Sequence, residues 1–240
     1  MTPLVAASQL TWSPDGRSIA VTAGDGETGT LSIVDTVDRT IGKIDVVTDY
    51  EEVQWRPPEG RQLIVTVRAS GGLRFALVST ANDLVEVLPA PVSDAGTLFR
   101  PGGWSLDGSR FAYSTMDSQI HVLDMEGGPD VVISPSLAQD TGAYPRFSND
   151  GRRIVFMELS TGAPSWLSVA PSDGKKPAIR ISDESLDPIG TDYHWSPDDS
   201  KIVLQPQNGG ARVLLDPAGG PAFTPSWMTE GVESWQRLAP

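Results

Sequence analysis

Residues 10–21 read LTWSPDGRSIAV, and variants of this stretch recur along the chain. A short strand ends at the aromatic residue, a tight turn follows, and an apolar strand comes next. Proline presets φ for the turn, aspartate can bond to its own backbone, and glycine tolerates positive φ. The stretch therefore predicts two β-strands joined by a tight turn.

Four further segments follow this template, and a truncated copy stands near the C-terminus. Their anchor aromatic residues are 43, 49, 43, 48 and 40 residues apart, which is the period of a four-stranded propeller blade. No helical 3.6-residue periodicity runs through the units, which excludes helical repeats of similar length. The further copies are VQWRPPEGRQLIV (53–65), GWSLDGSRFAY (103–113), RFSNDGRRIVF (146–156), HWSPDDSKIVL (194–204) and ESWQ (233–236).

The repeats predict an all-β fold, a β-propeller of four-stranded antiparallel blades with five full repeats and a partial sixth. The 24 Gly and 20 Pro of the 240 residues fit the many turns that such a fold needs. We expect one propeller domain over residues 1–240, with repeats at about 8–48, 51–90, 99–134, 143–182 and 191–226 and a closing strand at 232–237. Beyond the strand that ends at each anchor, the expected strands are 18–23, 31–35 and 41–47; 62–67, 75–79 and 84–88; 110–115, 120–124 and 131–133; 153–158, 166–170 and 178–181; and 201–205, 213–216 and 222–224.

The anchor aromatic residues have a structural explanation. Neighbouring propeller blades pack face to face, and each interface needs a large apolar side chain. Replacing a buried tryptophan there by alanine costs about 3–5 kcal/mol. We therefore expect these side chains to lie between blades: Trp12, Trp55, Trp104, Phe147, Trp195 and Trp235.

The sequence Trp-Ser-Pro-Asp-Gly followed by an Ile-Ala-Val strand resembles the TolB-like (PD40) β-propeller repeat, a relative of the Trp–Asp repeat. The resemblance covers about residues 3–237, and the second and fourth copies depart from the motif. TolB-like propellers usually have six blades and close through a blade shared by the two termini. Residues 232–236 resemble the closing inner strand, but only residues 3–7 precede the first repeat. Two interpretations follow: a closed five-bladed ring, or a six-bladed ring that lacks about 25–35 N-terminal residues.

Charge and composition exclude several classes of partner. The net charge is −13 and the 18 basic residues are scattered, so neither nucleic acid nor an anionic membrane surface is an expected partner. Cysteine is absent, which removes disulfides and thiol chemistry. The sequence has no stretch of about 18 apolar residues, the length that could span a membrane. Four lysines against fourteen arginines suggest a GC-rich bacterial source.

The N-terminal residues MTPLVAAS have no basic start and no apolar core of signal-peptide length. As written, the chain is expected in the cytoplasm. If a leader has been removed, the cell envelope is the expected location.

Candidate site residues stand just before and within the anchor strands, where propellers bind ligands at the mouth of the central channel. These residues are polar or aromatic, and two interpretations are compatible with them. They form either a solvated rim around the channel or a binding site for a protein loop or small polar ligand. The only histidines, His121 and His194, lack metal-site spacing, and no cofactor is expected. The candidates are Tyr50, Glu52, Arg100, Tyr144, Arg146, Asp192, His194 and Glu233.

Catalytic motifs are missing from the sequence. It has no Gly-x-Ser-x-Gly nucleophile elbow, no P-loop and no dinucleotide-binding glycine fingerprint. The resemblance therefore implies a non-enzymatic propeller that binds a protein partner as a scaffold or sensor module. The alternative is a small-molecule-binding protein, or an enzyme of the lyase, hydrolase or cyclase type, with its site at the channel mouth.

Overall fold

The structure is a computed structural model, and its described residues are all in strands, turns and loops. They fall into two compact units, Met1–Leu98 and Phe99–Pro240. No helix occurs within the described ranges, so none there could cross a membrane. These ranges are 7–24, 29–44, 48–69, 72–82, 85–88, 100–115, 119–133, 141–159, 165–183, 192–205 and 212–226.

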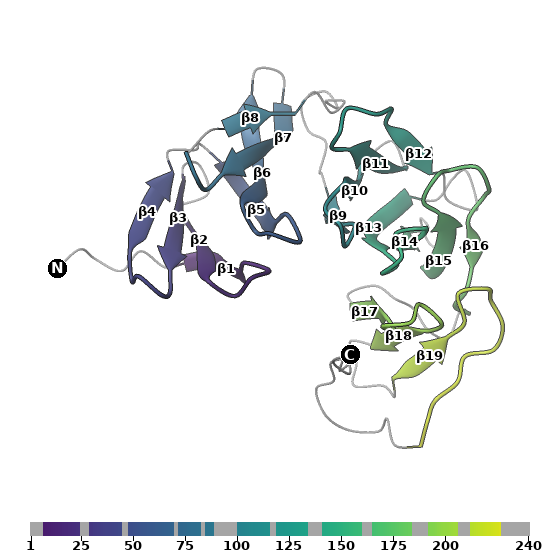
Figure 1. Cartoon of the computed structure of the whole chain (residues 1–240). Coiled ribbons are helices and arrows are strands. Elements are labelled where there is room, and N and C mark those ends of the chain that lie inside the picture. The colour runs from purple at the N-terminus through teal and green to yellow at the C-terminus, as the bar shows by residue number, and fades with distance from the viewer. Residues whose placement is uncertain are drawn as a thin grey trace. The chain divides into compact units, whose positions relative to one another are not determined.

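The first unit contains two four-stranded antiparallel sheets (Figure 1). In both sheets each strand pairs with the next one along the chain, as in a propeller blade. Blade 1 consists of β1 (Ala7–Trp12), β2 (Ser18–Gly24), β3 (Gly29–Asp35) and β4 (Ile41–Ile44), and blade 2 of β5 (Thr48–Trp55), β6 (Gln62–Ala69), β7 (Gly72–Ser79) and β8 (Val85–Val87).

The second unit contains three sheets with the same sequential order. Two have four strands and the last has three. Blade 3 consists of β9 (Arg100–Trp104), β10 (Arg110–Ser114), β11 (Ile120–Asp124) and β12 (Val131–Ile133); blade 4 of β13 (Thr141–Phe147), β14 (Arg153–Leu159), β15 (Trp166–Pro171) and β16 (Ile179–Arg180); and blade 5 of β17 (Asp192–Trp195), β18 (Ile202–Gln205) and β19 (Val213–Leu215).

The all-β, four-stranded antiparallel blades confirm the fold class expected from the repeats. The fourth strand expected at 222–224 is reduced to a single bridge between Leu214 and Phe223. Gly219 and Gly220 have φ of 88° and 125°, so the chain leaves the extended conformation just before this segment. Residues 3–6 and 232–237 lie outside the described part of the chain.

The core consists of apolar layers between consecutive blades within each unit. Strand β14 shows the principle, because it is buried on both faces. Ile154 and Phe156 join the cluster shared with blade 3, whereas Val155 and Met157 join the cluster shared with blade 5. The two-residue alternation of a strand thus sends successive side chains into two different interfaces.

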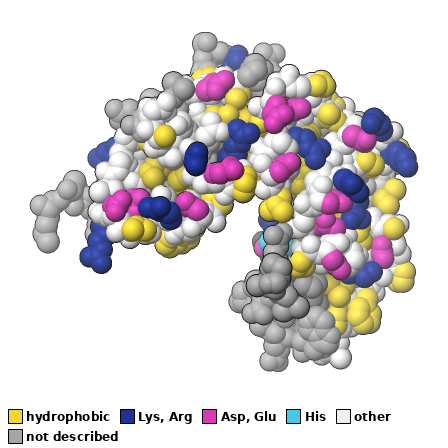
Figure 2. Space-filling view, viewed as in Figure 1, with side chains coloured by type: hydrophobic (Ala, Val, Ile, Leu, Met, Phe, Trp, Pro, Cys, Tyr) yellow, Lys and Arg dark blue, Asp and Glu magenta, His cyan; other side chains and the backbone are white. Residues whose placement is uncertain are grey.

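The charged side chains lie mostly outside these layers. Figure 2 shows acidic and basic side chains interspersed over the viewed face, with apolar side chains between them. The outer strands are short, with only two to four residues. Short edge strands limit pairing with other chains.

The anchor aromatic residues join neighbouring blades by packing and by hydrogen bonds. Trp55 is 6% exposed, and its indole Nε1 donates to the carbonyl of Thr11 in blade 1 (3.0 Å). Trp195 is 8% exposed and donates in the same way to the carbonyl of Arg146 in blade 4 (3.2 Å). In both cases the acceptor directly precedes the anchor of the previous blade.

The expected burial holds for Trp55, Phe147 and Trp195 but not for Trp12, which is 55% exposed. Blade 1 has no preceding blade within its own unit, and this explains the exposure. Trp104 is half-buried, and Trp235 lies outside the described residues.

Two arginines reinforce the interfaces of the second unit. Arg110 of β10 lies 5.1 Å from the ring centroid of Phe147 and donates to the carbonyl of Gly151 (2.5 Å). Arg153 of β14 lies 4.8 Å from the ring centroid of Trp195 and donates to the carbonyl of Asp199 (2.7 Å). Each arginine therefore covers the anchor of the next blade and holds its turn.

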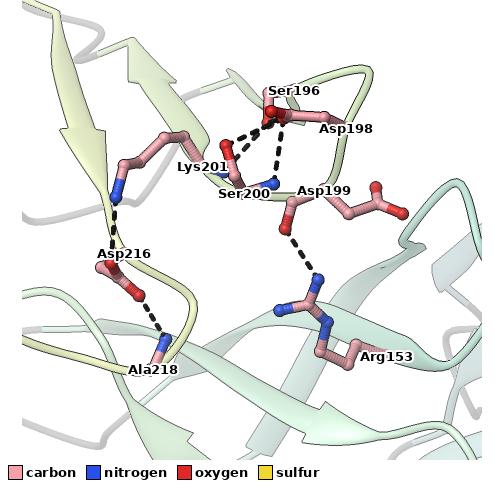
Figure 3. Close-up of polar contacts among 8 residues, drawn as sticks. All are labelled: Arg153, Ser196, Asp198, Asp199, Ser200, Lys201, Asp216 and Ala218. Atoms are coloured by element: carbon pink, nitrogen blue, oxygen red, sulfur yellow. Dashed lines mark hydrogen bonds and ion pairs between the residues drawn. The ribbon is translucent and has the colours of Figure 1, made fainter.

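In blades 1, 3, 4 and 5 the turn after the anchor is held by a serine and an aspartate two residues later. In blade 5 the Ser196 hydroxyl donates to Asp198 Oδ1 (2.7 Å), which also accepts from Ser200 (Figure 3). The hydrogen bond from Ser196 is the largest cause that lowers the pKa of Asp198 to about 2. The same serine–aspartate bond occurs between Ser13 and Asp15, Ser105 and Asp107, and Ser148 and Asp150.

Asp199 occupies the turn position where glycine stands in the other copies. Its φ is 59°, in the left-handed region, and it is 7% exposed. Its carboxylate accepts from the backbone N–H groups of Asn149 and Asp150 (both 2.8 Å) and from the Asn149 amide (2.7 Å). The strained residue thus caps the turn of the neighbouring blade.

The lowered pKa of Asp198 predicts acid sensitivity of the blade 5 turn. A lowered folded-state pKa contributes stability that is present above about pH 4 and lost as the pH falls toward about 2. Asp198→Asn should therefore be less stable than the parent near pH 7, and the difference should shrink at about pH 2.5. Denaturant unfolding at several pH values measures this, with Asp38→Asn, at an exposed aspartate, as the control. An undiminished difference at low pH would contradict the assignment.

Asp199→Gly should destabilise the second unit by about 2 kcal/mol, because the hydrogen bonds across the interface to blade 4 are lost. This loss should exceed the gain from relieving the left-handed strain of Asp199. Urea unfolding measures the change. Asp199→Asn keeps one carbonyl acceptor, so its free energy of unfolding should lie between those of the parent and of Asp199→Gly. A more stable glycine variant would mean that strain outweighs the interface contacts.

Candidate functional site

An irregular strand shapes the candidate site in blade 4. The register of β13 against β14 shifts between Ala143 and Arg146, which marks a β-bulge. Within the bulge, Tyr144 has a φ of 54° and its side chain is 40% exposed. A left-handed tyrosine is uncommon, and bulges of this kind often re-aim side chains near functional sites.

Neighbouring strands hold the bulge from both sides. Tyr193 of β17 is 2% exposed, and its hydroxyl donates to the carbonyl of Tyr144. Burial raises the pKa of the Tyr193 phenol. On the other side, a Cβ at Gly102 of β9 would lie 2.2 Å from the carbonyl oxygen of Pro145. Only glycine allows this close approach, so blades 3 and 5 together fix the conformation of the bulge.

Three polar side chains next to the bulge form a closed hydrogen-bonded triangle. Arg146 Nη2 donates to Asp192 Oδ1 (2.9 Å), and Arg146 Nη1 contacts His194 Nδ1 (3.1 Å). His194 Nε2 contacts Asp192 Oδ2 (2.8 Å). The side chains are 42%, 55% and 50% exposed for Arg146, Asp192 and His194, so the triangle lies at the surface.

The partners of His194 determine its tautomer. Arginine can only donate, so Nδ1 of His194 must be the acceptor. The proton of the neutral ring is therefore on Nε2, which donates to Asp192. The geometry fits an uncharged imidazole with both nitrogens engaged.

Arg146 is held in place but keeps donors for a ligand. Its guanidinium lies 5.4 Å from the ring centroid of Tyr193. Of its five N–H groups, two bond to Asp192 and His194 within the described part of the chain. The arrangement offers an oriented guanidinium at the surface, two residues after the exposed Tyr144.

A largely buried ion pair lies in blade 4 near the start of β13. Glu158 is fully buried, pairs in register with Gly142 of β13, and accepts from Arg180 Nε (2.9 Å). Arg180 also lies 4.7 Å from the ring centroid of Trp166. This pair was not predicted from the sequence, although a glutamate inside an otherwise apolar strand is a signal that could have indicated it.

The structure brings three of the sequence-predicted site residues together, because Arg146, Asp192 and His194 form the triangle, and Tyr144 lies two residues before Arg146 in the bulge of β13. Tyr50 and Glu52 lie in β5 and Arg100 begins β9, but their side chains and Glu233 lie outside the described part. That the whole set rings one channel mouth stays a prediction.

The second histidine has a different environment. His121 is 6% exposed, stacks on Tyr113 (5.2 Å between centroids), and bonds through Nδ1 to Asp130 (2.9 Å). These contacts give His121 a structural role within blade 3. Over the described ranges, no group of three or more His, Asp and Glu side chains could hold a metal ion.

Sequentially ordered four-stranded antiparallel sheets, packed through anchor aromatic residues, define a β-propeller-type repeat protein. No protein-family model and no curated protein matches the sequence. Among solved structures, the chain is similar to a protein assigned as TolB from Agrobacterium tumefaciens. That similarity has a TM-score of 0.65 and 20% identity, and covers 91% of this chain and 80% of the other. The chain therefore has the TolB-like β-propeller fold, as the sequence motif implied.

Two more solved structures support this fold. TolB from Acinetobacter baumannii aligns with a TM-score of 0.57 and 18% identity over 90% of this chain, which spans 56% of that longer chain. The Swd1 β-propeller domain of Myceliophteria thermophila aligns with a TM-score of 0.59 and 12% identity, covering 90% of this chain and 72% of the domain. At these identities the likeness establishes the fold alone.

Tyr193→Phe tests the support of the bulge. Loss of the buried hydroxyl leaves the Tyr144 carbonyl without this donor and should cost about 1–2 kcal/mol of stability. Denaturant unfolding measures this cost. Because burial raises the pKa of the phenol, the parent and the variant should show the same ultraviolet phenolate signal near pH 10 while folded. Extra phenolate absorbance in the parent at that pH would show that Tyr193 is not buried as described.

Proposed function

We propose that this protein is a non-enzymatic binding propeller that recognises a protein partner through the surface formed by Tyr144, Arg146, Asp192 and His194. We name this set the β13–β17 surface. Propellers of the TolB and WD40 kinds generally mediate protein interactions, which supports the proposal at the level of the fold. The observation that carries it is the rigidly held, exposed triangle beside a left-handed tyrosine.

The residue types also favour partner binding. Tyrosine and arginine are enriched at the energetic centres of protein interfaces, because they combine a large contact area with directed hydrogen bonds. Here the Tyr144 backbone is held by Tyr193, and Arg146 by Asp192 and His194. A surface whose side chains are already ordered loses less conformational entropy on binding.

The alternative of an enzyme with acid–base chemistry at this place is less well supported. A catalytic histidine needs a ring nitrogen within reach of the substrate. Both nitrogens of His194 are engaged, by Arg146 and by Asp192. The triangle would have to open before His194 could exchange a proton with a substrate.

Site-specific photo-crosslinking in the source cells tests the proposed function. A benzoylphenylalanine at position 144 should crosslink a defined partner protein, and Arg146→Ala should reduce that product strongly. The same probe at Leu106, which is 51% exposed in a turn of blade 3, serves as the matched control. Equal crosslinking from both positions, or a product unaffected by Arg146→Ala, would refute the proposal.

A further inference from the structure

We propose that Arg146 is the anchor for a carboxylate of the partner polypeptide, and that protonation of His194 strengthens this contact. The inference rests on the proposed function and specifies the chemistry of the partner. A guanidinium recognises a carboxylate through two parallel N–H donors, which requires an oriented and accessible arginine.

The orientation of Arg146 meets this requirement. One edge of the guanidinium is fixed by Asp192 and His194, and one face lies over the ring of Tyr193. The remaining N–H groups belong to a side chain that is 42% exposed. An incoming carboxylate can therefore bond to Arg146 without displacing Asp192.

The local charge explains why His194 would control the affinity. With a neutral imidazole, the charges of Arg146 and Asp192 cancel, so an anion gains little net attraction. A protonated His194 carries donors on both nitrogens. It keeps the bond to Asp192, but its Nδ1 can no longer accept from Arg146.

Protonation thus makes the triangle net positive and frees Arg146 Nη1 for the ligand. Histidine is the side chain whose charge ordinarily changes between about pH 5 and pH 8.

The groups that face His194 belong to three strands. Asp192 lies on β17 itself, and Arg146 lies on β13. On β18 the cross-strand partner is Val203, and this strand, Ile202–Gln205, has no ionisable side chain. The charged groups of the triangle are Arg146, Asp192 and His194. Arg212 adds a positive charge nearby, because it donates to Gln205, the cross-strand partner of Asp192.

The test uses a glycine pentapeptide with a central glutamate, acetylated and amidated at its ends. Its binding to the whole protein is followed through the side-chain NMR signals of Arg146 and His194 at about pH 5.5 and about pH 7.5. We expect saturable shifts that require about fivefold less peptide at the lower pH, the effect of one additional nearby charge. A glutamine peptide with an amidated end should give no saturable shift.

Four variants assign the roles. Arg146→Gln should abolish binding, and Arg146→Lys should weaken it because lysine lacks the planar pair of donors. His194→Gln should bind with no difference between the two pH values. Arg152→Gln, at an exposed arginine in the adjoining turn, should bind like the parent. Thermal unfolding confirms that each variant is folded.

A glutamine peptide with a free C-terminus distinguishes the source of the carboxylate: its binding would indicate recognition of a chain terminus, and binding of the glutamate peptide alone would indicate a side chain. No saturable shift with either carboxylate peptide would overturn the inference. Retained pH dependence in His194→Gln would overturn the role of His194. If the peptides do not bind but crosslinking at position 144 still captures a partner, only the carboxylate inference is refuted. If crosslinking also fails, the proposed function is refuted as well.

Discussion

The contact between one blade and the next is the interaction on which the rest of the structure depends. A single four-stranded sheet cannot bury both of its apolar faces, so each blade is stable only against a neighbour. The anchor aromatic residue fills this interface, and in Trp55 and Trp195 its indole also bonds to the preceding blade. Arg110 and Arg153 cover the next anchor and hold the next turn. Packing, hydrogen bonds and charge therefore act at the same interface.

The candidate site arises where this regular pattern is interrupted. The bulge in β13 breaks the ladder with β14 and leaves Tyr144 in a left-handed conformation. Such a conformation persists only when its surroundings hold it. Tyr193 bonds to it from blade 5, and Gly102 of blade 3 leaves room for it. The same blade contacts that stabilise the fold thus also position the polar triangle at the surface.

The repeated motif made most of the architecture predictable from sequence. Expected strands at 120–124 and 131–133 match β11 and β12, because Asp, Gly and apolar alternation mark turns and strands locally. The expected strand at 222–224 became a single bridge, since two glycines with positive φ precede it. Burial of Trp12 was also expected and is not observed, because burial depends on a neighbouring blade rather than on the residue itself.

For the candidate site, the sequence by itself determined which polar residues stand just before and within the anchor strands, since the repeat period places equivalent positions at the same end of each blade. Tertiary structure decided that Arg146, Asp192 and His194 bond to one another and that Glu158 pairs with Arg180. The contacts of Arg146 with Asp192 and His194 join residues 46 and 48 positions apart, and Glu158 and Arg180 are 22 positions apart, so these contacts depend on strand register, a bulge and blade packing. Local sequence patterns encode turns and strands, but side-chain partners across blades are fixed only when the blades pack.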